Sequence, residues 1–169
     1  MNVNAAPRTP DARRILDFAK SELFDRTFKE GMALVEETAT YLDGPGRAAS
    51  KRLPRLPALA YAGESMRLTT RLMQVASWLL VQRAVRDGEM SLADAASDKY
   101  RLSSRDSGDA SALAGAEDLP EALTALAKKG AAIYERVRRL DQDMYAPSPA
   151  GENAVDAQRA RLEAAFGGR

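Results

Sequence analysis

The sequence predicts an all-α protein, and three features support this fold class. Ala and Leu supply most of the apolar residues, and both favour helices. Aromatic residues make up only 6% of the chain, and the β-branched runs that a sheet needs are scarce. Apolar side chains recur at helical spacing through three long segments. We therefore expect an antiparallel three-helix bundle with a flexible N-terminus and a flexible C-terminal tail.

The expected domain organisation follows from composition along the chain. The 169 residues suffice for one domain with a modest core. Residues 1–14 are polar, contain two prolines and are expected to be disordered. The bundle is expected over residues 15–145, with a flexible linker near residues 103–116. Residues 146–169 are expected to form a flexible tail.

The first long helix is expected to begin between residues 15 and 21 and to run to Leu42. Gly44-Pro45-Gly46 should end it, because Gly suits the left-handed position after a helix and Pro cannot continue the turn. The side chains that share one helical arc should pack into the core. These are Phe24, Phe28, Met32, Val35, Ala39 and Leu42.

A basic connection is expected over residues 43–58, which are rich in Pro and Gly. Four cations lie in it, against Asp43 alone: Arg47, Lys51, Arg52 and Arg55. Two interpretations stay open, a solvated loop and a contact site for an acidic protein partner.

The second long helix should begin near Pro57, since Pro is favoured in a first turn, and should run to about Arg86. Its core face is expected to be one broad arc: Leu68, Leu72, Met73, Ala76, Leu79 and Leu80. Ser91 followed by Asp94 resembles a capping pattern, so a short helix is expected over residues 92–101.

The third long helix has Asp118 as its expected N-cap and Pro120 in its first turn, and it should end near Tyr145. It carries a single apolar stripe: Leu119, Leu123, Leu126, Gly130, Ile133, Val137, Leu140 and Met144. Beyond it, a short helix over residues 155–166 would place Val155, Leu162 and Phe166 on one face. Three such anchors are too few to stabilise an isolated helix, so we expect this tail to dock on a partner protein, with packing of the tail back on the bundle as the alternative.

A second apolar stripe accompanies the first on two of the helices. Leu23, Leu34 and Tyr41 lie opposite the first face of helix one, and Trp78, Val81 and Val85 lie together on helix two. Wide packing, a covering by the short Ser91 helix, or an oligomer or partner interface would each explain this surplus. We favour the interface, because exposed apolar patches tend to mark association sites. Leu34, Tyr41, Trp78, Val81 and Val85 are therefore candidate protein-binding residues.

The composition argues against an enzyme. The chain contains no His and no Cys, which removes the commonest general base, thiol nucleophiles and Cys- or His-based metal sites. We expect no catalytic residue, no metal and no cofactor. Lys plus Arg is 25 and Asp plus Glu is 24, so a net charge of +1 gives no general reason to bind nucleic acid.

A cytoplasmic protein without membrane contact is the simplest expectation. The first fourteen residues lack the apolar stretch of a signal peptide. The longest uncharged stretch in the apolar middle, Leu72 to Gln82, is shorter than the about 20 residues that span a bilayer.

Two stretches resemble a known family. GMALVEETATYLDGPGR (Gly31–Arg47) and LAYAGESMRLTTRLMQVASWLLVQRAVRDGEM (Leu59–Met90) are similar to those of the family called regulator of CtrA degradation, RcdA. The resemblance is close over about the first hundred residues and only general beyond residue 103. It implies a three-helix bundle that forms a homodimer. It also implies an adaptor of the ATP-dependent protease ClpXP, which joins a ClpX unfoldase primed by a CpdR-like response regulator and delivers cell-cycle regulators as protein cargo.

Two hypotheses follow from the sequence. In the first, the protein is a non-enzymatic adaptor that tethers cargo near the unfoldase and so raises its effective concentration. In the second, it is a structural or scaffolding helical dimer that mediates protein–protein interaction without a link to proteolysis. Cargo turnover in the presence of the protein would distinguish them.

Overall fold

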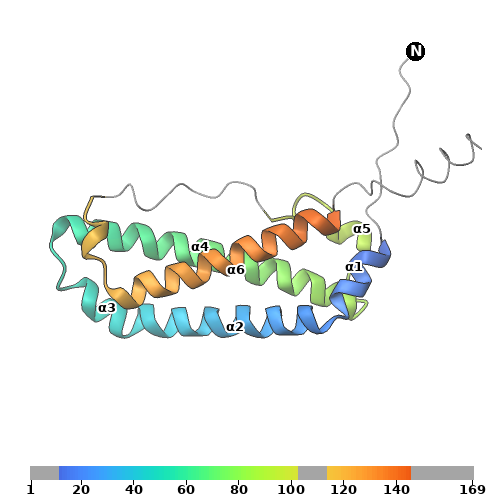
Figure 1. Ribbon diagram of the computed structural model, residues 1–169, viewed down its shortest axis with the longest axis horizontal. Coiled ribbons are helices and arrows are strands. Elements are labelled where there is room, and N and C mark those ends of the chain that lie inside the picture. The colour runs from blue at the N-terminus through green and yellow to red at the C-terminus, as the bar shows by residue number, and fades with distance from the viewer. Residues whose placement is uncertain (1–11, 103–113, 146–169) are drawn as a thin grey trace, which may run out of the picture.

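The computed structural model describes residues 12–102 and 114–145, and these residues form helices and connections without a strand (Figure 1). The all-α prediction is confirmed. In chain order the helices are α1 (Ala12–Ala19), α2 (Glu22–Asp43), α3 (Pro45–Ser50), α4 (Arg55–Arg86), α5 (Leu92–Ala95), the 3₁₀ turn η2 (Ala116–Asp118) and α6 (Glu121–Tyr145). None of the helices in this described part is long and apolar enough to cross a membrane.

Three long helices, α2, α4 and α6, lie side by side, and the short helices sit at the ends of this group (Figure 1). α2 runs opposite to α6, as the ion pairs of Glu37 with Lys129 and of Glu30 with Arg136 show. α4 and α6 instead run in the same direction, because Trp78 contacts Asp141 and Gln82 contacts Tyr145.

The predicted antiparallel arrangement is therefore wrong for the pair α4 and α6. The connection between them spans residues 87–120 and is long enough to return the chain along the whole length of α4. A short connection would have forced neighbouring helices into opposite directions. The sequence prediction did not take into account that the length of this connection affects the relative direction of α4 and α6.

Three predicted boundaries also need correction. The first helix is divided at Ser21, whose hydroxyl accepts from the Phe24 N–H at 3.2 Å and donates to the Phe18 carbonyl at 2.7 Å, so that it ends α1 and caps α2. Helix α1 also begins at Ala12, inside the segment that was expected to be disordered. Residues 43–58 are not one loop, because Pro45 opens α3 and α4 begins at Arg55.

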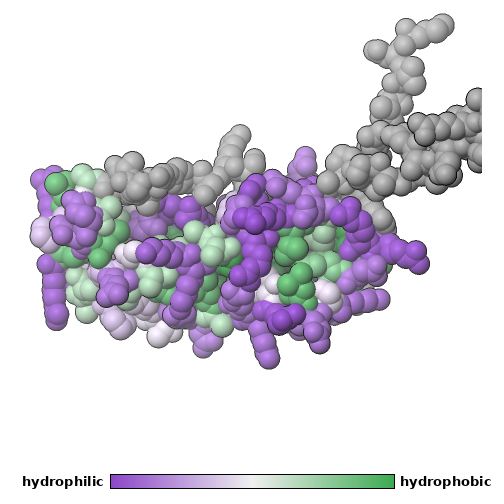
Figure 2. Space-filling model, viewed as in Figure 1, coloured by the Kyte–Doolittle hydropathy of each residue, from purple (hydrophilic) through white to green (hydrophobic). Residues whose placement is uncertain are grey.

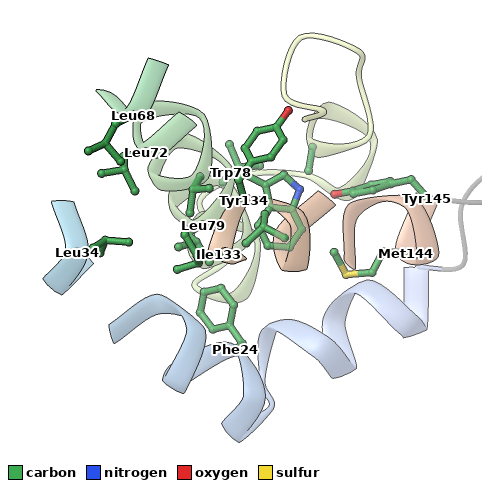
Figure 3. Close-up of a cluster of buried hydrophobic side chains, with 14 of the residues drawn as sticks. Phe24, Leu34, Leu68, Leu72, Trp78, Leu79, Ile133, Tyr134, Met144 and Tyr145 are labelled. Carbon is green, nitrogen blue, oxygen red and sulfur yellow. The ribbon is translucent and has the colours of Figure 1, made fainter. Parts of the chain in front are cut away.

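The core lies where the three long helices and α1 meet (Figure 3). Trp78 of α4 is 1% exposed, and its ring lies 5.9 Å from that of Phe18, which in turn lies 5.8 Å from Phe24. Helix α6 contributes the stripe that its periodicity predicted, with Leu123, Ile133 and Val137 fully buried. Burial of each such side chain stabilises the fold by about 1.5–3 kcal/mol.

Two glycines allow the long helices to approach closely. A Cβ atom at Gly31 of α2 would lie 2.7 Å from Leu79 Cδ1, and one at Gly130 of α6 would lie 2.6 Å from Leu68 Cδ1. Both leucines belong to α4, so the absence of a side chain at these glycines lets α4 pack against both neighbours.

The core face of α4 differs from the predicted one. Leu68, Leu72 and Leu79 are buried as expected, but Met73 and Leu80 are 65% and 52% exposed. Their places in the core are taken by side chains of the presumed second stripe: Trp78, Val81 and Val85. In α2, Phe24 is buried as predicted, whereas Leu34 of the second stripe is also core. Hydrophobic periodicity alone cannot decide which of two apolar faces points inward.

Candidate protein-binding surface

The outward side of α4 carries an uncharged surface, which we call the α4 outer face. Every exposed residue of α4 between positions 56 and 80 is uncharged. Five of them are large apolar side chains with exposed fractions from 52% to 72%. The face comprises Leu56, Leu59, Ala62, Met66, Thr69, Thr70, Met73, Ser77 and Leu80.

The apolar side chains of the α4 outer face follow a regular spacing. Leu59, Met66, Met73 and Leu80 are seven residues apart, so they form one stripe that drifts only about 20° per heptad. Smaller residues separate them, a pattern typical of the depressions of a knobs-into-holes contact. A partner helix packs its side chains into such depressions in a coiled-coil contact.

The hydroxyl groups of the two threonines on this face already have hydrogen-bond partners within α4. Thr69 Oγ1 donates to the Ser65 carbonyl at 2.8 Å, and Thr70 Oγ1 donates to the Met66 carbonyl at 2.9 Å. Because the hydroxyls are bonded within their own helix, burying them against a partner costs less than burying free hydroxyls.

The outer faces of α2 and α6 are charged by contrast. In α6 the exposed positions include Glu121, Lys128, Lys129, Arg136, Arg139 and Asp143. Figure 2 views the molecule from this side: hydrophilic side chains spread over α2 and α6, and hydrophobic ones gather mainly between the two helices. Such faces remain in water, whereas a long uncharged helical face is typical of an interface.

A groove of about 470 Å³ adjoins the α4 outer face and shares Thr70, Met73 and Ser77 with it. Its other wall is the segment of residues 99–102, which follows α5. Trp78 and Val81 also line this groove, although both belong to the core. The groove extends the apolar surface sideways from α4.

A buried polar network holds the groove wall in place. The Trp78 Nε1–H donates to Asp141 Oδ1 at 2.8 Å, and Arg101 Nε donates to both Asp141 carboxylate oxygens at 3.0 Å. The Arg101 guanidinium also lies 4.3 Å from the ring centroid of Tyr145. Burial raises the pKa of Tyr145, and the hydrogen bond from Gln82 opposes that rise. The network ties α4, α6 and residues 99–102 together.

The structure places most of the predicted apolar binding residues inside the protein. Leu34, Trp78, Val81 and Val85 are 9% exposed or less, so the expectation that they form an exposed stripe is wrong. The reason is that α2 and α4 each meet two neighbours and need a wide core face. A binding role for Trp78 and Val81 stays a prediction, through the groove that they line.

Tyr41 lies half-buried beside Tyr61, at the end of α2 that leads into α3. Burial raises the pKa of Tyr41, and the neighbouring Tyr61 hydroxyl adds to that rise. Gly46 packs against both rings, since a Cβ atom there would lie 2.6 Å from the Tyr61 hydroxyl and 2.7 Å from Tyr41 Cε1. The role of Tyr41 in protein binding stays a prediction.

The predicted basic residues do come together on the surface. Arg47 belongs to α3, Lys51 and Arg52 follow it directly, and Arg55 opens α4, and all four are exposed. Their role as a contact for an acidic partner stays a prediction. Val155, Leu162 and Phe166 lie outside the described residues.

Sequence reasoning missed the α4 outer face as a surface, and it placed Met73 and Leu80 in the core. The available signal was the seven-residue spacing of Leu59, Met66, Met73 and Leu80. Such an uncharged apolar surface is suited to contact with another protein. Across residues 12–102 and 114–145, no cluster of acidic side chains is placed to hold a metal ion.

The chain is similar to a described protein family and to a solved structure. The profile of a family described as "Protein of unknown function (DUF1465)" matches residues 15–166. The crystal structure of RcdA from Caulobacter crescentus CB15 matches with 57% sequence identity and a TM-score of 0.65, covering 79% of this chain and 99% of that chain. A search of curated proteins finds no match.

Proposed function

The chain belongs to the RcdA family, and from this membership we propose that it is a non-enzymatic adaptor that delivers cell-cycle regulatory proteins to the ClpXP protease. In this proposal the three-helix bundle is a rigid frame, and its surfaces hold cargo and the unfoldase near one another. The gain in degradation rate comes from a raised effective concentration of cargo, not from chemistry on the adaptor.

The α4 outer face is the observation that supports a binding role most directly. Full burial of a Leu or Met side chain contributes about 1.5–3 kcal/mol, so its four heptad-spaced side chains contribute at most about 6–12 kcal/mol. Association costs about 4–15 kcal/mol in lost freedom. Because these estimates are similar, we expect reversible association, which suits an adaptor that must release its cargo.

A second copy of the chain and a cargo protein are both candidate occupants of this face. A homodimer that buries the α4 outer face would protect its apolar side chains when cargo is absent. The unfoldase ClpX, primed by a CpdR-like response regulator, would then be contacted elsewhere on the bundle. This division of surfaces is part of the proposal.

The alternative function is a scaffolding helical dimer without a link to proteolysis. It would use the same uncharged face, so the face alone does not distinguish the two functions. Family membership favours the adaptor, because the family name designates regulation of the degradation of CtrA.

A reconstituted degradation assay tests the adaptor function. Purified CtrA is incubated with ClpXP, ATP and a CpdR-like regulator, with and without this protein, and CtrA loss is followed by gel. We expect CtrA to be degraded faster when the protein is present, and Met66→Glu/Met73→Glu to remove most of that acceleration.

Ala125→Glu/Ala132→Glu is the matched control, because it adds two negative charges seven residues apart on the exposed side of α6. The control should accelerate degradation like the unmodified protein. Equal degradation with and without the unmodified protein would instead favour the scaffolding function.

A further inference from the structure

A second groove lies at the opposite end of α2 from α3, between the first turns of α2 and the last turns of α4. It has a volume of about 510 Å³ and is lined by two aromatic rings, Phe24 and Phe28. Around them stand four cations and Asp25; the cations are Arg26, Lys29, Arg83 and Arg86. We call this the basic groove.

The cations of the basic groove form two pairs on neighbouring helices. Arg26 and Lys29 are three residues apart on α2, and Arg83 and Arg86 are three residues apart on α4. Residues at this spacing project from the same side of a helix. The packing of α2 against α4 brings both pairs to one groove, although 54 positions of sequence separate Lys29 from Arg83.

Two of these cations are held in position by the aromatic rings. The Arg83 guanidinium lies 5.4 Å from the ring centroid of Phe28, and the Arg86 guanidinium lies 5.3 Å from that of Phe24. The two rings lie 5.8 Å apart. Contacts of this kind restrain a long side chain before a ligand arrives, and so reduce the ordering cost of binding.

The acids nearby do not neutralise the groove. Arg86 is engaged twice, with Asp25 at 2.9 Å and with Asp87 at 3.3 Å. Arg83 approaches Asp87 only to 3.6 Å and is half-exposed. Arg26 and Lys29 form no ion pair with any residue in the described part of the chain. Arg26, Lys29 and Arg83 therefore keep unused hydrogen-bond donors around the apolar rings that line the groove.

We propose that the basic groove docks an acidic segment of a partner protein, with an apolar side chain of that segment resting on Phe28. Arg83 offers a planar pair of donors that matches a carboxylate, and Arg26 and Lys29 supply further positive charge. A nucleic acid fits less well, because Asp25 and Asp87 would face its continuous phosphate backbone and the whole chain carries only +1. This docking does not require the proteolytic function proposed above.

Fluorescence anisotropy with a short labelled peptide of alternating Glu and Phe tests this docking on the full chain. We expect saturable binding that weakens as salt rises, since exposed charges are screened. Arg26→Ala/Lys29→Ala/Arg83→Ala should weaken binding about tenfold, because three charged contacts are lost. The same peptide with Gln in place of Glu should bind far more weakly.

Lys128→Ala/Arg136→Ala/Arg139→Ala is the matched control, since it removes two arginines and one lysine from the exposed side of α6. Retained peptide binding in this control supports the basic groove. An equal loss in both triple variants, no binding at all, or tighter binding of a single-stranded RNA probe than of the peptide would overturn the proposal. Circular dichroism checks that both variants keep the helical fold.

Discussion

The two faces of α4 are both apolar, but only the inner one is fixed by specific partners. Trp78 on the inner face is packed against Phe18 and donates its indole N–H to the buried Asp141. Met66 and Met73 on the outer face are 72% and 65% exposed and lie on an uncharged surface. The comparison shows that two faces of one helix can be equally apolar although one is buried in the core and the other is exposed.

The outer faces of α4 and α6 are both exposed, but they differ in charge. Both lie on the surface, but α6 presents charges that pair with one another or with α2, such as Glu135 with Arg138 and Lys129 with Glu37. Water solvates such a face well, and a partner would have to remove that water. The α4 outer face carries no comparable penalty, which makes it the more suitable surface for another protein.

Substitution of Trp78 should have the largest effect. Trp78→Ala leaves a cavity and removes one of the hydrogen bonds to the buried Asp141, and it should lower the free energy of unfolding by about 3–5 kcal/mol. Met73→Ala, on the same helix but exposed, should change it by less than about 0.5 kcal/mol. Urea denaturation followed by circular dichroism measures both. Similar losses in the two variants would mean that the faces of α4 do not differ as described.

Self-association should respond to the outer face alone. Met66→Glu/Met73→Glu places two charges in the apolar stripe, and burial of an unpaired charge disfavours an interface. We expect the dissociation constant of the proposed homodimer to rise at least about tenfold, which corresponds to about 1.4 kcal/mol. Light scattering over a dilution series measures this constant.

The melting temperature of this variant should stay close to that of the unmodified protein, because both methionines are exposed. Ala125→Glu/Ala132→Glu again serves as the control on α6 and should leave the dimer intact. A dimer that resists the methionine changes would place the interface on another surface.

The smallest expected effect concerns the charged face of α6 in acid. Hydrogen bonds from Arg138 and then Arg139 lower the pKa of Glu135 from its ordinary 4.5 to about 2. A depressed carboxyl pKa stabilises the folded state above the ordinary value, and this contribution is lost as the pH falls from 4.5 toward 2. The Glu135 side chain is 40% exposed, so solvent keeps the effect small.

Glu135→Gln should therefore melt slightly below the unmodified protein near neutral pH, and the difference should vanish below about pH 2. Scanning calorimetry at several pH values measures it. A difference that persists at the acid end would show that the carboxylate acts through packing and not through its charge.

The sequence by itself determined the helices and much of the core. Periodicity identified the three long helices and the single stripe of α6, where Leu123, Ile133 and Val137 are buried as predicted. It succeeded there because α6 has charged residues on its remaining faces, so only one orientation buries its apolar side chains. The close similarity of Gly31–Arg47 and Leu59–Met90 to the RcdA family also came from the sequence alone.

Only the tertiary structure decided which face of α4 points inward. Trp78 and Asp141 are 63 positions apart, and their hydrogen bond selects the inner face by pairing a polar indole N–H with a buried carboxylate. The direction of α6 likewise depends on the path of residues 87–120, and the basic groove depends on two helices meeting. Periodicity along one helix contains no information about such partners, because each is set by contacts between residues far apart in the chain.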